Sequence, residues 1–124
     1  MNQNPLDVTT KVIGGKIVIA NSDIPLILDG QSALDFAANV GHENNCYNIA
    51  VHKAAIADEF FDLSTGIAGE VVQKFVNYGF KLAIIGDFSG YASKYLHDYI
   101  YECNKGSHLF FVANENEAVK RLGG

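Results

Sequence analysis

Two short segments of this chain combine carboxylate and hydroxyl side chains with glycine, residue types that could bind an anion or carry a regulatory phosphate. They are Asp62-Leu63-Ser64-Thr65-Gly66 and Gly86-Asp87-Phe88-Ser89-Gly90. Each precedes a stretch that we expect to be helical, and a helix start presents unpaired backbone N–H groups and the positive end of a dipole. The candidate regulatory or ligand-binding residues are Asp62, Ser64, Thr65, Gly66, Asp87 and Ser89.

Both segments also have a purely structural interpretation. Ser64, Thr65 and Ser89 are good helix caps, because a hydroxyl oxygen can accept a hydrogen bond from the first N–H groups of a helix. Gly66 can allow close approach of the helix to a sheet or a partner. Helix capping and ligand binding therefore remain alternative interpretations of each segment.

No other residue pattern indicates chemistry. The histidines at positions 42, 52, 97 and 108 are not spaced as i, i+4 pairs, and Cys46 and Cys103 lie in no Cys-x-x-Cys motif. The sequence therefore predicts no metal, no cofactor and two free thiols. Since no nucleophile and base can be paired by spacing, a non-enzymatic role is favoured over catalysis.

Composition limits the class of protein. The chain has 124 residues, of which 48% are hydrophobic and 19% charged, as expected for one domain over residues 1–124. Its net charge of −5 and scattered basic residues argue against binding to nucleic acid or to an anionic membrane surface. The N-terminal residues do not resemble a signal peptide, so we expect a cytoplasmic protein.

Residue patterns predict alternating strands and helices. β-Branched runs on both sides of Gly14-Gly15 indicate an opening hairpin, since glycine readily adopts the positive φ that such turns need. The clearest helix is Gly66–Tyr78, which has a broad apolar stripe and ends at Gly79. The expected strands are Thr9–Ile13, Lys16–Asn21, Pro25–Leu28, Asn48–Lys53, Lys81–Gly86 and His108–Ala113.

Three further helices complete the pattern. One is capped by Ser32 with Asp35 and stops at Gly41, and another runs from Ser89 to about Asn104. The last begins at Asn114, with Glu117 three residues later. The order predicts an α/β domain with a mixed, largely parallel sheet, an N-terminal antiparallel hairpin and about four helices.

One part of the chain resembles STAS domains, the family of anti-sigma-factor antagonists and sulfate-transporter tails. In that family a strand leads through an Asp-Ser-Ser/Thr-Gly turn into a helix, and a Gly-Lys/Arg-Leu strand follows. Here Phe61–Ile67, the helix and Gly79–Gly86 have this order, and the likeness covers about residues 48–122. The whole chain also resembles a small bacterial family of unknown function that shares segments like 31–35 and 87–89.

The resemblance implies a regulatory, protein-interaction module that is switched by phosphorylation. Counting back from Gly66, Thr65 matches the phosphorylated position and Ser64 the one before it, while Leu63 falls where the family has its acid. The alternative is a small ligand-binding domain or enzyme with a pocket at the strand ends near Asp62 and Asp87. We expect a protein partner, and the sequence leaves a homo-oligomer open.

Overall fold

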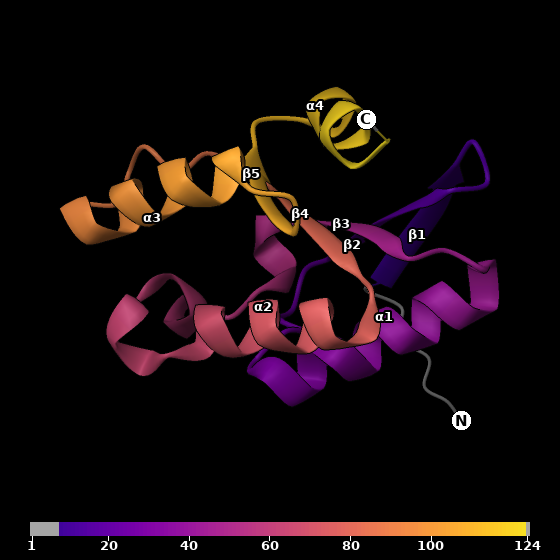
Figure 1. Cartoon of the computed structure of the whole chain (residues 1–124), viewed down its shortest axis with the longest axis horizontal. Coiled ribbons are helices and arrows are strands. Elements are labelled where there is room, and N and C mark those ends of the chain that lie inside the picture. Colours follow the sequence, from indigo (N-terminus) through magenta and orange to yellow (C-terminus); the bar gives the residue numbers. More distant parts are fainter. Residues whose placement is uncertain (1–7, 124) are drawn as a thin grey trace.

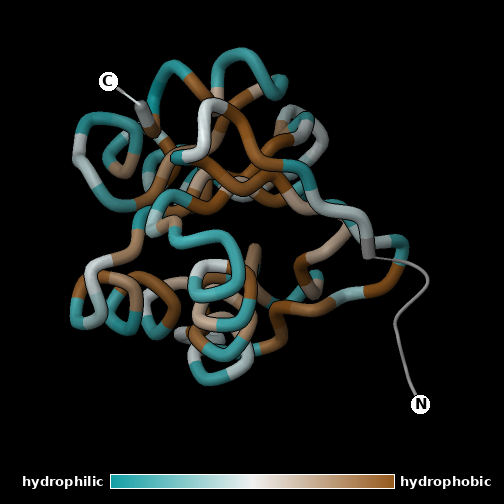
Figure 2. The backbone as a smooth tube through the Cα atoms, turned by 90° about the vertical axis from the view of Figure 1, so that its right-hand side faces the viewer, coloured by the Kyte–Doolittle hydropathy of each residue, from teal (hydrophilic) through white to brown (hydrophobic). Residues whose placement is uncertain are grey.

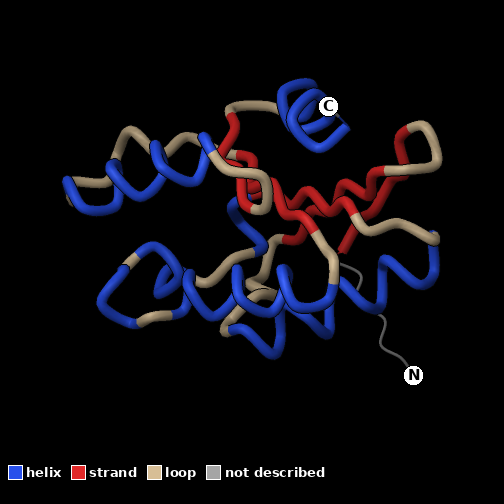
Figure 3. Tube along the Cα trace, in the orientation of Figure 1, coloured by secondary structure: helices blue, strands red, loops and turns tan. Residues whose placement is uncertain are grey.

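A five-stranded mixed sheet runs through the middle of the molecule (Figure 3). The computed structural model describes residues 8–123. The strands lie in sequence order: β1 (Val8–Ile13), β2 (Ile17–Ser22), β3 (Asn48–His52), β4 (Lys81–Ile85) and β5 (Leu109–Val112). β1 and β2 are antiparallel, and each later strand is parallel to its neighbour. The predicted mixed sheet with its opening hairpin is confirmed.

Four helices cover the two faces of this sheet (Figure 1). α1 (Gly30–Asn44) and α2 (Ile67–Tyr78) pack side by side on one face, and α4 (Glu115–Gly123) lies on the other. α3 (Lys94–Lys105) packs at β5 and places Leu96 in the same core as α1 and α2. Within residues 8–123, no helix is both long and apolar enough to cross a membrane.

Strand side chains alternate between two cores. The core under α1 and α2 includes Val18, Ile49, Leu82 and Ile84, whereas their strand neighbours belong to the core under α4. Hydropathy along the backbone shows the same layering, with apolar strands between helices of mixed character (Figure 2). Burial on both faces explains why the central strands read as nearly continuous apolar runs.

The prediction of a strand at Pro25–Leu28 is wrong. The segment forms one isolated parallel bridge, between Ile27 and Ile56, instead of a strand. The backbone N–H groups of Leu26 and Ile27 both donate to the carbonyl of Ala55, and the Ile27 side chain is fully buried. The apolar run therefore reflects the burial of Ile27 in a segment without regular secondary structure.

The predicted limits of α1 need correction at both ends. Asp29, not Ser32, is the N-cap, and Ser32 occupies the third helical position of a reciprocal capping box. Gly41 does not stop the helix, which runs to Asn44 and is capped by Asn45 in the left-handed conformation with φ 56°. A Cβ on Gly41 would lie 2.6 Å from the Cys46 carbonyl oxygen and 3.0 Å from the Phe80 ring. Gly41 is thus required by close packing.

α3 begins later than predicted, at Lys94. Ser93 is its cap, since the Ser93 hydroxyl oxygen accepts from the backbone N–H of Leu96. Ser89 instead donates its hydroxyl proton to the Asp87 carboxylate and takes no part in the helix. The last helix starts as predicted, because the Asn114 side chain accepts from the Glu117 N–H at 2.8 Å.

Replacing Gly41 with alanine should destabilise the protein by about 1–3 kcal/mol, because the added methyl group overpacks the contact with Cys46 and Phe80. Gly69→Ala in α2 is the matched control, since a Cβ there has no neighbour within 4 Å. That variant should gain up to about 1 kcal/mol from helix propensity. Urea unfolding of both variants provides the test. Equal stabilisation by the two substitutions would contradict the packing argument.

Candidate functional site

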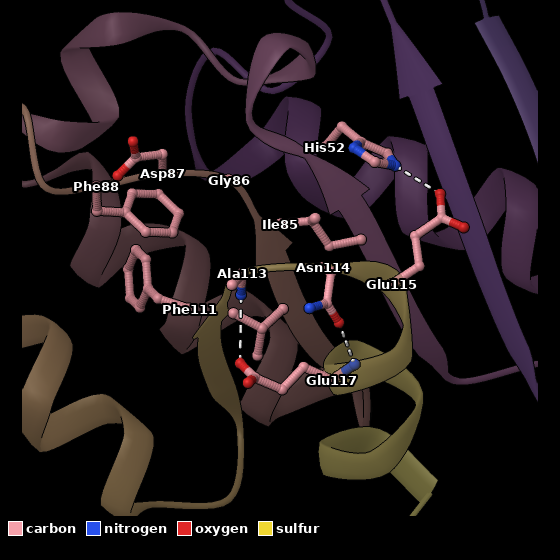
Figure 4. Close-up of a pocket in the computed structure, with 11 residues that line it drawn as sticks. His52, Ile85, Gly86, Asp87, Phe88, Phe111, Ala113, Asn114, Glu115 and Glu117 are labelled. Atoms are coloured by element: carbon pink, nitrogen blue, oxygen red, sulfur yellow. Dashed lines mark hydrogen bonds and ion pairs between the residues drawn. The ribbon is translucent and has the colours of Figure 1, made fainter.

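An open hollow of about 730 Å³ lies at the carboxyl ends of β3, β4 and β5 (Figure 4). This is the edge at which open α/β sheets bind ligands, and the volume is in the range of small-molecule sites. Its walls mix apolar side chains with carboxylates and one imidazole. The lining residues are His52, Ile85, Gly86, Asp87, Phe88, Phe111, Val112, Ala113, Asn114, Glu115 and Glu117.

An ion-pair cluster forms one end of the hollow. The Nε2 atom of His52 lies 2.7 Å from Oε2 of Glu115, and the Lys11 ammonium lies 2.7 Å from the other carboxylate oxygen. The cluster joins the end of β3, the start of α4 and, through Lys11, the hairpin strand β1. Figure 4 shows the contact between His52 and Glu115. Hydrogen bonds from Lys11 and His52 hold the pKa of Glu115 below its usual value. The carboxylate therefore fixes the imidazole in one orientation, which is the arrangement that a general base needs.

The wall formed by the start of α4 is held by its own capping bonds. The Asn114 side chain accepts from the N–H of Glu117, and the Glu117 carboxylate accepts from the N–H of Ala113 at 3.3 Å. Both carboxylates of the first turn, Glu115 and Glu117, suit the positive end of the helix dipole. The polar groups on this side are thus held in place by the helix itself.

A tight polar turn forms the opposite end of the hollow. Asp87 accepts from both the hydroxyl and the backbone N–H of Ser89, at 2.7 and 2.9 Å. Both hydrogen bonds lower the pKa of Asp87, and the bond from the Ser89 hydroxyl has the larger effect. Asp87 lines the hollow, but Ser89 does not. Asp87 is therefore an ionised carboxylate, and Ser89 occupies one of its two oxygens, Oδ1.

The Lys53 side chain ties this turn to the end of β3. Its ammonium lies 4.6 Å from the ring centre of Tyr91 and about 6 Å from those of Phe61 and Phe88. It also donates to the Asp87 carbonyl at 3.3 Å. Such cation–π contacts contribute about 0.5–1 kcal/mol each at partly exposed positions. The cluster fixes the loop that follows β4.

Gly86 makes room for this lysine. A Cβ on Gly86 would lie 2.9 Å from the Lys53 Cβ and 3.1 Å from its Cδ. Any other residue at the end of β4 would therefore displace the lysine or the loop. Gly86 was part of the predicted polar segment, but its structural role is to leave space for the Lys53 side chain.

The other predicted segment forms an exposed turn before α2. Asp62 accepts from the hydroxyl and the backbone N–H of Ser64, as Asp87 does from Ser89, and these bonds lower its pKa. The Thr65 hydroxyl lies 2.8 Å from the Asp62 carbonyl oxygen and accepts from the N–H of Ile67 at 3.2 Å. Gly66, with φ 78°, is the N-cap of α2 and supplies no side-chain cap. The expected cap at Ser64 or Thr65 is corrected to this position.

The two predicted segments do not share one pocket. Asp87 belongs to the hollow, whereas Asp62, Ser64, Thr65 and Gly66 are not among its lining residues. They are linked by aromatic packing, since the ring centres of Phe61 and Phe88 lie 5.9 Å apart, and by the Lys53 ammonium that lies near both rings. The predicted convergence of Asp62 and Asp87 on a single pocket is therefore not seen.

Sequence reasoning missed His52, Lys53 and Glu115. His52 and Glu115 are 63 positions apart, so no local spacing could pair them. One signal was available: His52 ends a buried strand and Lys53 follows it, and Glu115 lies three residues after another buried strand. Since parallel strands end at the same edge of a sheet, these positions had to be near one another.

The cysteines lie outside the hollow. Cys46 is buried beside the end of α1, and Cys103 is half-buried on α3. Burial raises the pKa of the Cys103 thiol, which disfavours the reactive thiolate. Among residues 8–123, no group of three or more His, Cys, Asp or Glu side chains is arranged to hold a metal ion.

The Glu115 cluster predicts an acid-dependent loss of stability. Because the folded-state pKa of Glu115 is lowered, its contribution is present above about pH 4.5 and is lost as the pH falls further. Glu115→Gln should lower stability at pH 7 by about 1 kcal/mol or less, as for other partly exposed ion pairs. The difference between variant and wild type should shrink towards pH 3 in thermal melts. Glu102→Gln, which breaks an exposed pair with Lys105 on α3, is the control and should change stability less.

The family of the chain follows from a comparison with known families. A family model described as "Domain of unknown function (DUF4180)" matches residues 13–122, which include all five strands in whole or in part and every residue of the hollow. No curated protein matches the chain. The match covers the larger part of the sequence, and the chain therefore belongs to the DUF4180 family of domains of unknown function.

Proposed function

We propose that this protein is a non-enzymatic regulatory module that binds a protein partner, with the turn Asp62–Gly66 as its switch. The module is of STAS-like type, and a phosphate on Thr65 or Ser64 changes its affinity for the partner. The observation that carries this proposal is the exposure of both hydroxyl-bearing residues on a turn at the start of α2.

The geometry of the turn supports access by a kinase. Ser64, Thr65 and Gly66 are all exposed, and the turn lies at the start of α2 and does not line the hollow. Their hydrogen bonds are short-range, so a modified side chain can leave them without disturbing the core. Each lost bond costs about 0.5–1.5 kcal/mol.

The local electrostatics give a phosphate two opposing effects. The start of α2, which Gly66 leaves without a side-chain cap, would partly stabilise the added charge. The exposed carboxylates of Asp58 and Glu59, which precede the turn, and of Asp62, which begins it, would oppose the phosphate. A phosphate of about −2 charge would thus make this surface strongly acidic while leaving the fold intact.

Substitutions that mimic or remove the phosphate test the switch. Thr65→Asp and Ser64→Asp should remain folded but bind about tenfold or more weakly to a partner recovered by pull-down from the native host. Thr65→Ala should keep the partner and lose about 1 kcal/mol of stability or less. Calorimetric titration and thermal melts provide the measurements. Ser107→Asp, which adds the same charge at an exposed site before β5, is the control.

Undiminished binding by both aspartate variants would exclude the switch. Equal weakening by Ser107→Asp would show only a general effect of charge.

A second candidate function is supported by the hollow. His52 is oriented by Glu115 at the carboxyl ends of the parallel strands, where a small ligand would contact it. A fragment library added to the ¹⁵N-labelled protein should then shift the amide signals of Gly86, Ala113 and Glu115. His52→Gln should weaken such binding about tenfold, as expected from loss of one charge-assisted hydrogen bond. Fragments that shift no amide around the hollow would exclude this candidate.

A further inference from the structure

The two edges of the sheet are protected differently. At the β5 edge, the Asn104 side chain donates to the Phe111 carbonyl at 3.2 Å and accepts from the Phe111 N–H at 2.8 Å. This side-chain amide occupies the positions that a further strand would use. At the other edge, none of the described residues pairs with the outer side of β1. Among residues 8–123, one edge is therefore covered at Phe111 and the other is left unpaired.

β1 also lacks the features that usually prevent edge pairing. It is six residues long, it contains no proline, and its pairing with β2 is continuous without a bulge. Its one charged residue, Lys11, is bound to Glu115 of the same chain. Val12 and Ile13 are 39% and 37% exposed, which is high for apolar strand residues. Natural proteins avoid such an edge unless it is used.

The register of the hairpin identifies the free backbone groups. The Lys16 N–H donates to the Ile13 carbonyl, which places Ile13 in a hydrogen-bonded pair with Ile17. Because hydrogen-bonded and non-hydrogen-bonded pairs alternate in an antiparallel ladder, Thr10 and Val12 direct their N–H and C=O groups away from β2. These groups are available to a further strand.

We propose that the open edge of β1 pairs antiparallel with β1 of a second copy of this chain, giving a symmetric dimer with a continuous ten-stranded sheet. A two-fold axis through Thr10 places the two Thr10 residues opposite each other and Thr9 opposite Lys11 of the other copy. No like charges then face each other across the interface, and Thr–Thr is a favourable cross-strand pair. A strand without acidic residues, whose single lysine is already neutralised, is complementary to itself.

Proline at position 10 tests the interface directly. Thr10→Pro removes an outward N–H but no bond to β2, and proline is tolerated on edge strands in this orientation. The wild type should have the mass of two chains in light scattering after size-exclusion chromatography. Two symmetry-related hydrogen bonds are lost in the variant, so its dimer should dissociate about 10- to 100-fold more readily. Thr10→Val, which keeps the N–H, should remain dimeric.

A second variant and a backbone measurement keep the test decisive if proline disturbs folding. Thr10→Lys places two ammonium groups opposite each other and should give a folded monomer. In the wild type, hydrogen exchange at the Thr10 and Val12 amides should slow as the protein concentration rises. A wild type that is monomeric at all concentrations would overturn the proposal, as would a dimer that survives both substitutions.

Discussion

Burial of the central strands on both faces is the constraint on which the rest of this structure depends. Ile49, Ala50 and Val51 of β3, like Leu82–Ile85 of β4, are almost fully buried. Neighbouring parallel strands must be joined by crossovers, and the helices of those crossovers cover the sheet. The parallel arrangement then brings the ends of β3, β4 and β5 to one edge, which is where the hollow lies. Its position is a consequence of topology, whatever it binds.

The loops at that edge combine local polar bonds with aromatic packing against the core. The same Asp-x-Ser turn occurs after β4 and before α2, in each case with the serine hydroxyl 2.7 Å from the aspartate oxygen. Such turns satisfy a carboxylate within three residues, so the loop needs no partner elsewhere. The aromatic cluster around Lys53 then joins the two loops to each other. Rigid loops on a rigid sheet are the usual arrangement for binding surfaces.

The sequence predicted those features that depend on local pattern. The strong apolar stripe of 66–78 and the positive-φ glycines of the hairpin gave α2 and the β1–β2 turn almost at their observed positions. Predictions failed where a distant contact decides. Gly41 looked like a helix stop, yet it lies inside α1, where the ring of Phe80, 39 positions away in sequence, leaves no room for a side chain. His52 and Glu115 could be paired only after the strand order was known.

The short helix α4 connects the two edges of the sheet. At its start, Glu115 binds Lys11 of the hairpin, and near its end, Arg121 donates to the Asn104 carbonyl and lies over the Phe110 ring. Asn104 is also the residue whose side chain closes the β5 edge. Detachment of α4 would therefore remove one contact from the hairpin and one from the end of α3 at the same time. The two contacts are thus thermodynamically linked through α4, and a ligand that displaces this helix would weaken both.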